Sequence, residues 1–404
     1  MPSEPELQQQ AGVYQLTWKD EHLVIRVDRI HTEKAGVYGE ILIRTAAPGY
    51  QPHIHGPVHF NLTSTQSRRQ LVTHLSLIIE IDWTGILEQT CYIVVEQHRE
   101  GIPAINIANH QMPEALKMRV APLLQEKQAT LFFGEGDSLK SFFATYLSIL
   151  VKSGLVGSGL TPEPGNVLYL DYETDVDTFW ERVNMVTAGL DISIPDGLFY
   201  RSMVEPLTHE FPRVNDLVME HGIELVIVDS AAPATGEPEN AEIVTSFFRA
   251  LRSLQSTSLV IAHMTKSAKG DYPFGSTFWR NLPRSNFQIK ADRTTNNVAI
   301  SLRHTKANNG NRLPLLGFQF AFDEDTVRIT SAKPGDHPDL ANDLPLAQQI
   351  KNILGRGTKS LDEIDQLVDK SRAQVITTLN RHNNKVFTQI TPGYWGLLSE
   401  TRHE

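Results

Sequence analysis

The stretch that decides the fold runs Thr-Leu-Phe-Phe-Gly-Glu-Gly-Asp-Ser-Leu-Lys-Ser over residues 130–141 and continues Phe-Phe-Ala-Thr-Tyr-Leu-Ser-Ile-Leu to residue 150. An apolar run of strand type, Thr130–Phe133, precedes a turn-rich loop, and apolar residues at helical spacing follow it. A strand, a glycine-containing loop and a helix that opens with Lys-Ser are the context of a phosphate-binding loop. The backbone N–H groups of such a loop and the positive end of the helix behind it favour a polyphosphate.

We therefore expect this loop to bind ATP and Mg²⁺. Lys140 would reach the β- and γ-phosphates, and the Ser141 hydroxyl would hold the metal ion. The pattern departs from G-x-x-x-x-G-K-[ST] at Leu139, so either the loop is shifted or Gly136 supplies the flexibility. The alternative is an ordinary strand, turn and helix with a chance Lys-Ser. The residues expected to contact nucleotide are Gly134, Glu135, Gly136, Asp137, Ser138, Leu139, Lys140 and Ser141.

Composition limits the class of protein. The 404 residues are 40% hydrophobic and 21% charged, which is typical of a soluble chain with room for two or three domains. No apolar run approaches the roughly 20 residues of a membrane span, and the polar N-terminus does not resemble a secretory signal. With Cys91 as its single cysteine the chain has no internal disulfide, so we expect a cytoplasmic protein. A net charge of −10 restricts any nucleic-acid contact to a local basic patch.

Residues 1–107 are predicted to form a small α+β domain, followed by a linker over residues 108–128. His22–Ile30 and Tyr38–Thr45 carry apolar residues at period two, which indicates strands. A helix is predicted over Ser64–Ile79. The composition of Thr90–Gln97 favours a strand.

Three histidines of this part of the chain, His53, His55 and His59, lie around two prolines. No acidic residue stands near them in the sequence, so ordinary loop histidines are favoured over metal ligands.

Residues 129–335 alternate predicted strands and helices, which indicates a mostly parallel, doubly wound sheet flanked by helices. Ligands of such sheets bind at the carboxyl ends of the strands. Asp229 follows Leu-Val-Ile-Val as a metal-binding aspartate would, although a helix cap is the alternative. Glu173, after Val-Leu-Tyr-Leu-Asp-Tyr, is the candidate general base, with Asp171 and Asp175 as competitors. His263 ends the next strand as a candidate γ-phosphate sensor or a buried structural histidine.

A phosphate loop followed by strands ending in Glu, in Asp-Ser and in His resembles the RecA-like ATPases. The nearest branch is that of the plasmid RepA and DnaB-type hexameric helicases, the AAA_25 group. The resemblance covers about residues 129–330. It implies a ring-shaped homo-oligomer, with a hexamer favoured, in which ATP hydrolysis is coupled to DNA.

The same resemblance implies a residue that completes a neighbouring subunit's site. Lys306, in Lys-Ala-Asn-Asn-Gly, resembles the first residue of the family's Lys-x-Arg-Asn-Gly segment, although Asn308 replaces its arginine. Arg284 and Arg303 are the alternatives for that role.

Two segments are candidates for contact with DNA. Residues 266–274 combine Lys266 and Lys269 with Tyr272, a mixture that suits single-stranded nucleic acid; a surface loop without such a role is the alternative. Residues 336–404 are predicted to form a winged helix-turn-helix of three helices and a hairpin. Arg372 and Arg381 lie on the second helix of this helix-turn-helix motif, and Lys385 lies at the wing. These side chains could contact duplex DNA. Against DNA, the preceding helix is acidic, and such modules also bind proteins.

The leading hypothesis is a Mg²⁺-dependent ATPase that binds DNA or moves along it as a ring. One alternative is a recombinase-like or regulatory ATPase without unwinding activity, and another is a non-enzymatic DNA-binding regulator.

Overall fold

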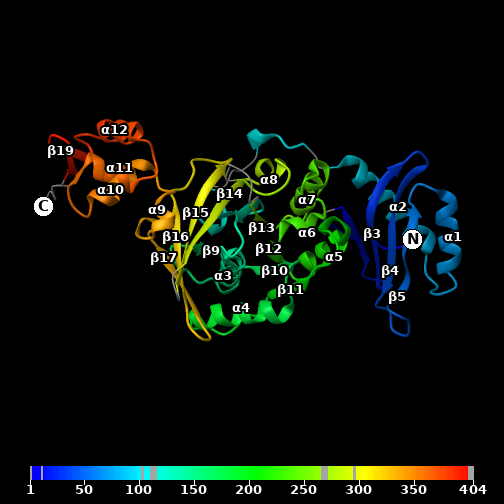
Figure 1. Ribbon diagram of the computed structural model, residues 1–404. Helices are drawn as coiled ribbons and strands as arrows, with labels where there is room; N and C mark the ends of the chain where they lie inside the picture. Colours follow the sequence, from blue (N-terminus) through cyan, green and yellow to red (C-terminus); the bar gives the residue numbers. More distant parts are fainter. Residues whose placement is uncertain are drawn as a thin grey trace. The chain divides into compact units, whose positions relative to one another are not determined.

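The computed structural model describes residues 2–10, 12–101, 104–109, 116–264, 272–293 and 297–398. The chain divides into two compact units (Figure 1). The first contains residues 1–116, 207–220 and 249–255, and the second contains the remainder. Among the described residues, no helix combines the length and the apolar character that crossing a bilayer requires.

The first unit is built on a five-stranded antiparallel sheet in the order β1-β2-β3-β4-β5. In β3, Leu23, Ile25 and Val27 are buried while the residues between them are not, as expected for a strand with one face on a core. The elements are β1 Glu6–Gln10, β2 Val13–Trp18, β3 Leu23–Glu33, β4 Gly36–Thr45, β5 His53–Asn61, α1 Thr65–Leu75, α2 Trp83–Glu100, a short 3₁₀ helix Ile107–Asn109 and α5 Leu207–Glu220.

One prediction for this unit is wrong. Thr90–Gln97 is not a strand but part of helix α2. The β-branched residues there favour a strand by composition, but Ile86, Thr90 and Val94 are buried at helical spacing. The helix therefore forms because its apolar stripe packs against the sheet, and this packing overrides local propensity.

The second unit contains a sheet that has nine strands within the described residues, in the order β11-β10-β12-β13-β8-β14-β15-β16-β17. The pairs from β11 to β14 are parallel and those from β14 to β17 antiparallel. The predicted mostly parallel sheet is thus confirmed. The strands are β8 Ala129–Gly134, β10 Asn166–Asp171, β11 Leu198–Ser202, β12 Ile223–Asp229, β13 Thr257–His263, β14 Ser285–Arg293, β15 Asn297–Ala307, β16 Leu316–Phe322 and β17 Val327–Ala332.

Helices cover this sheet because its parallel strands are apolar on both faces. Helices α3 and α4 share one hydrophobic core with alternate residues of the strands, and the intervening strand residues, such as Phe133 and Val228, are also buried. The helices are α3 Lys140–Ser153, α4 Val176–Gly189, α6 Ala231–Thr235, α7 Ala241–Ser253 and α8 Phe278–Asn281. A small sheet in the order β7-β6-β9 joins β6 Met118–Ala121, β7 Leu124–Gln125 and β9 Thr161–Pro162.

The C-terminal segment has a hydrophobic core of its own. It contains helices and a β-hairpin, and Ser360 forms the expected capping box with Glu363. A DNA-binding role for these elements stays a prediction. Their bounds are α9 Pro338–Ala341 after a 3₁₀ turn Pro334–Asp336, α10 Leu346–Leu354, β18 Lys359–Ser360, α11 Leu361–Leu367, α12 Arg372–Arg381, β19 Phe387–Thr391 and β20 Tyr394–Leu397.

Candidate active site

The strand ends named in the sequence analysis meet at one edge of the central sheet. Strands β10, β12, β13 and β8 are adjacent and parallel. Their register places Asp171 beside Asp229, and His263 beside Gly134. Glu173 follows β10 by two residues. The carboxyl edge of the sheet therefore brings together the loop, a buried aspartate, a glutamate and a histidine.

Lys140 begins helix α3 and its ammonium group closes the loop. Its Nζ donates hydrogen bonds to the carbonyl oxygens of Gly134 (3.3 Å) and Glu135 (2.6 Å) and to Ser138 Oγ (3.1 Å). The residue is only 5% exposed. Burial lowers the pKa of Lys140, while the negative charges of Asp229 and Glu173 oppose that shift. This cation is thus held where the loop would meet a polyphosphate.

The loop conformation explains why Leu139 is tolerated. Leu139 has φ 57° and ψ 24°, in the left-handed region that glycine occupies most readily. Asp137 also has a positive φ, whereas Gly136 does not, so Gly136 is not the residue that supplies the unusual backbone. The Leu139 side chain packs against the hydrophobic core. Leucine therefore takes the glycine-like backbone conformation without filling the phosphate site.

Gly134 has a steric requirement of its own. A Cβ at this position would lie 2.3 Å from the carbonyl oxygen of Ile289 on the neighbouring strand β14. At Gly136 a Cβ would meet no atom within 4 Å.

Asp229 is a buried acidic group of this edge that could hold a metal ion. It is 2% exposed, and Oδ2 accepts a hydrogen bond from the Tyr169 hydroxyl at 2.6 Å. Burial raises the pKa of Asp229, and the hydroxyls of Tyr169 and Ser141 oppose this shift. Oδ1 is buried, and no atom of the described residues forms a hydrogen bond with it. A buried carboxylate oxygen next to a serine hydroxyl fits Mg²⁺, which prefers oxygen ligands.

Glu173 lies at the centre of a hydrogen-bonded group. Its Oε1 accepts from Ser230 Oγ at 2.5 Å and lies 3.1 Å from His263 Nε2. The hydrogen bond with His263 is the main reason why the pKa of Glu173 is below its ordinary value. Ser230 acts in the same direction and partial burial opposes it. Glu173 is thus ionised at neutral pH and able to accept a proton.

The two competing carboxylates have structural partners. Asp171 accepts backbone N–H groups of Glu173 and Thr174 and the Thr174 hydroxyl. Asp175 caps α4 by accepting from the Thr178 N–H at 2.8 Å. Both contacts fix the turn that presents Glu173, which favours Glu173 as the residue available to substrate.

Comparison with known families agrees with this geometry. Residues 98–269 match the family model AAA_25, described as an AAA domain. This segment is similar to AAA_25 domains. The family is one of P-loop ATPases, so the similarity supports nucleotide binding and ATPase activity. No curated protein matches the chain.

The residues suggested to act on a neighbouring copy lie beyond the matched segment and at the other edge of the sheet. The backbone N–H of Arg284 bonds to the carbonyl of Ala129, at the start of β8. Lys306 Nζ donates to the carbonyls of Asn281 and Pro283, both at 2.6 Å. Burial lowers the pKa of Lys306, and the neighbouring arginines Arg284 and Arg280 add to this effect. Neither cation lies at the phosphate loop of its own AAA domain.

The candidate DNA contacts are spread over two regions. Lys266 and Lys269 lie outside the described residues. Tyr272 is 48% exposed, and the Arg280 guanidinium lies 4.8 Å from the centre of its ring. Together with Phe274 these residues line a cavity of about 580 Å³.

On the C-terminal helices, Arg372 pairs with Asp362 (2.6 Å) and Asp365 (3.5 Å), which offsets its charge. Arg381 and Lys385 are exposed.

Three side chains that contact the site residues were not predicted from the sequence. Ser230 binds Glu173, Tyr169 holds Asp229, and Arg293 donates to the carbonyl of Asp137 in the loop. Ser230 directly follows Asp229, so its place at the strand end could have been inferred. Tyr169 and Arg293 reach the site from strand positions whose register no sequence pattern gives.

Proposed function

We propose that this protein binds ATP with Mg²⁺ at the carboxyl edge of its central sheet and hydrolyses it. The observation that carries the proposal is the convergence of the closed loop, the buried Asp229 and the His263-bound Glu173 on adjacent strands. An ordinary strand-turn-helix does not require this convergence. The similarity of residues 98–269 to the AAA_25 family model supports the same proposal.

Each residue has a role that follows from its environment. The loop would bind the phosphates through its backbone N–H groups, and Lys140 would exchange its carbonyl contacts for phosphate oxygens. Ser141 and Asp229 would hold Mg²⁺, which neutralises phosphate charge when bound. Glu173 would orient the attacking water and accept its proton. His263, bound to that carboxylate, would link the state of the phosphates to the segment after β13.

We propose further that hydrolysis is shared between copies in a ring and coupled to DNA. Arg284 and Lys306 lie near the amino end of β8, while Gly134 lies at its carboxyl end. At about 3.3 Å per residue this separation is roughly 15 Å, so these cations would serve a neighbouring copy's site. The stacked Tyr272–Arg280 pair suits contact with single-stranded DNA. We place the protein in the cytoplasm.

A single substitution tests the site. Lys140→Ala should lower ATP turnover at least about a hundredfold, because it removes the cation nearest the phosphates. Lys117→Ala, at an exposed lysine outside the site, is the matched control and should keep wild-type turnover. Circular dichroism of both variants establishes that they are folded. Full activity in folded Lys140→Ala protein would contradict the assignment.

The coupling to DNA has its own measurement. Turnover is recorded with and without single-stranded DNA, and strand displacement is assayed with a forked duplex. Stimulation with displacement identifies a motor, and stimulation without displacement identifies a recombinase-like or regulatory ATPase. Turnover that DNA does not change would contradict the coupling.

A further inference from the structure

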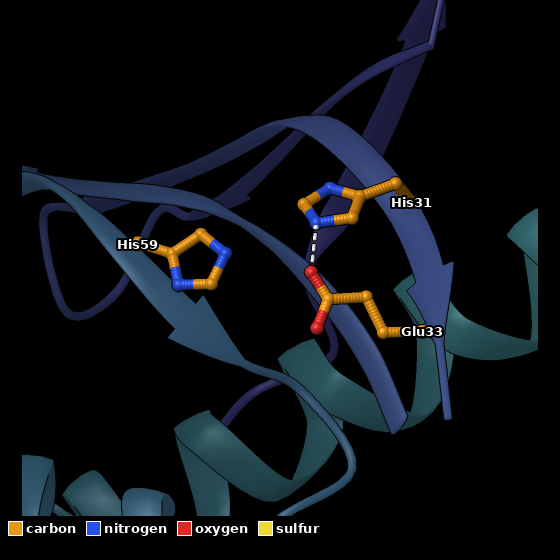
Figure 2. A group of neighbouring side chains, drawn as sticks. All are labelled: His31, Glu33 and His59. Carbon is orange, nitrogen blue, oxygen red and sulfur yellow. Dashed lines mark hydrogen bonds and ion pairs between the residues drawn. The ribbon is translucent and has the colours of Figure 1, made fainter. Parts of the chain in front are cut away.

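A cluster of metal-ligating side chains lies on the first unit. It consists of His31 and Glu33 on β3 and His59 on β5 (Figure 2). One ligand atom from each residue lies within 4.8 Å of the other two. Among the described residues, no other group of three histidine, cysteine or carboxylate side chains meets this criterion. Of the three histidines that the sequence places around two prolines, all lie on strand β5 and not in a loop, and His59 gains an acidic partner from another strand.

The tautomer of His31 is set by the backbone. His31 Nδ1 lies 3.0 Å from the carbonyl oxygen of Arg29. A carbonyl oxygen only accepts hydrogen bonds, so Nδ1 carries a proton. Ligating histidines are oriented in this way, with one ring nitrogen bound to a carbonyl and the other directed at the metal.

The other nitrogen faces a negative charge. His31 Nε2 lies 3.1 Å from Glu33 Oε1, and Figure 2 shows the two atoms directed at each other. In a neutral ring with its proton on Nδ1, this contact would join two acceptors. The contact therefore needs either a proton on Nε2, as in an ordinary ion pair, or a metal ion between the two atoms. A proton would join only His31 and Glu33. A metal ion would also bind His59, whose ring lies across from Glu33.

The scaffold holds the three side chains in place. His31 and Glu33 are two residues apart on one strand and so project from the same face of the sheet. The ring of Tyr38, on the intervening strand β4, stacks on His59 with centroids 5.0 Å apart and on His31 at 5.9 Å. Ligands placed on two strands that both pair with β4, and packed against a ring on β4, need little reorganisation to bind an ion.

We propose that His31, Glu33 and His59 form a binding site for a divalent transition metal ion, with Zn²⁺ as the best fit. Two imidazoles and one carboxylate are a ligand set that Zn²⁺ favours, and water supplies the fourth position because all three side chains are exposed. Ca²⁺ and Mg²⁺ fit poorly because they prefer oxygen ligands throughout. A bound ion would join β3 to β5 across β4.

Zinc titration of the full chain tests the proposal. Binding is measured by competition with a chromophoric chelator in the presence of excess Mg²⁺, which saturates oxygen-rich sites. His59→Ala and Glu33→Gln should each weaken binding of one Zn²⁺ at least about tenfold, the lower bound for disturbing a ligand shell. His98→Ala, a histidine of the same unit outside the cluster, should bind Zn²⁺ like the wild type. Wild-type protein that takes up no Zn²⁺, or equal affinity in all variants, would overturn the site.

A second measurement distinguishes the loss of metal binding from misfolding of a variant. Bound ions raise the thermal midpoint of a protein that binds them only when folded. Zn²⁺ should therefore raise the midpoint of the wild type and of His98→Ala, and raise that of His59→Gln by less. A rise of equal size in His59→Gln would show that the ion binds elsewhere and would contradict the proposal.

Discussion

Two neighbours lower the pKa of Glu173, and this gives a prediction at the scale of single residues. The lowered pKa of Glu173 means that its carboxylate keeps its charge until the pH falls below the usual range of a glutamate. In His263→Ala the main stabilising hydrogen bond is lost, so the pKa of Glu173 rises. The acid limb of the kcat/KM profile should then move to higher pH.

Ser230→Ala is the internal comparison for this prediction. Ser230 also lowers the pKa of Glu173, but by less than His263. Its loss should move the acid limb in the same direction by a smaller amount. The measurement is the pH dependence of ATP turnover for both variants and the wild type. An acid limb that stays in place in both variants, or moves to lower pH, would argue against Glu173 as the base.

At the scale of elements, the phosphate loop offers a matched pair of glycine substitutions. Gly134→Ala would force a Cβ against the backbone of β14, so we expect a loss of about 1–3 kcal/mol in the free energy of unfolding. At Gly136 an added Cβ lies in open space and the backbone conformation is ordinary. Gly136→Ala should therefore change the free energy of unfolding by less than about 0.5 kcal/mol. Urea denaturation of both variants and of the wild type measures these changes in the free energy of unfolding. Equal effects of the two would mean that β8 and β14 do not approach as described.

The same scale shows what the sequence could predict. The parallel strands can be predicted from the sequence because each is an apolar run that ends at a polar residue, as in Leu225–Val228 before Asp229. The helix α2 was misread because its β-branched residues carry a strand signal that packing overrides. Helix α5 and strands β11 and β14 were not predicted; Pro212 interrupts the helical pattern of α5. The carboxyl-edge residues followed from strand ends, whereas the partners of Asp229 and the cluster at His31 depend on register between strands.

At the scale of the whole molecule, the position of Lys306 predicts that active sites are shared between copies. Lys140→Ala should inactivate a copy's own site, and Lys306→Ala should inactivate its neighbour's. A mixture of the two inactive proteins would then contain some interfaces with an intact loop and an intact lysine. For random mixing in a ring, roughly a quarter of the interfaces would be of this kind, so activity should reappear.

The control for this mixing experiment is each variant alone at the same total concentration, with sizing in the presence of ATP to establish assembly. Activity that fails to reappear in an assembled mixture would assign Lys306 a structural role, through its bonds to Asn281 and Pro283.

The most direct test of the central claim is to measure ATP binding and ATP turnover side by side in the wild type and in Glu173→Gln. The amide keeps the size of the side chain but cannot accept the proton, so binding should stay within a fewfold of wild type. Turnover should fall by about 10²–10⁴, the contribution of a general base. A wild-type protein that does not bind ATP, or a Glu173→Gln variant that hydrolyses it at the wild-type rate, would contradict the account.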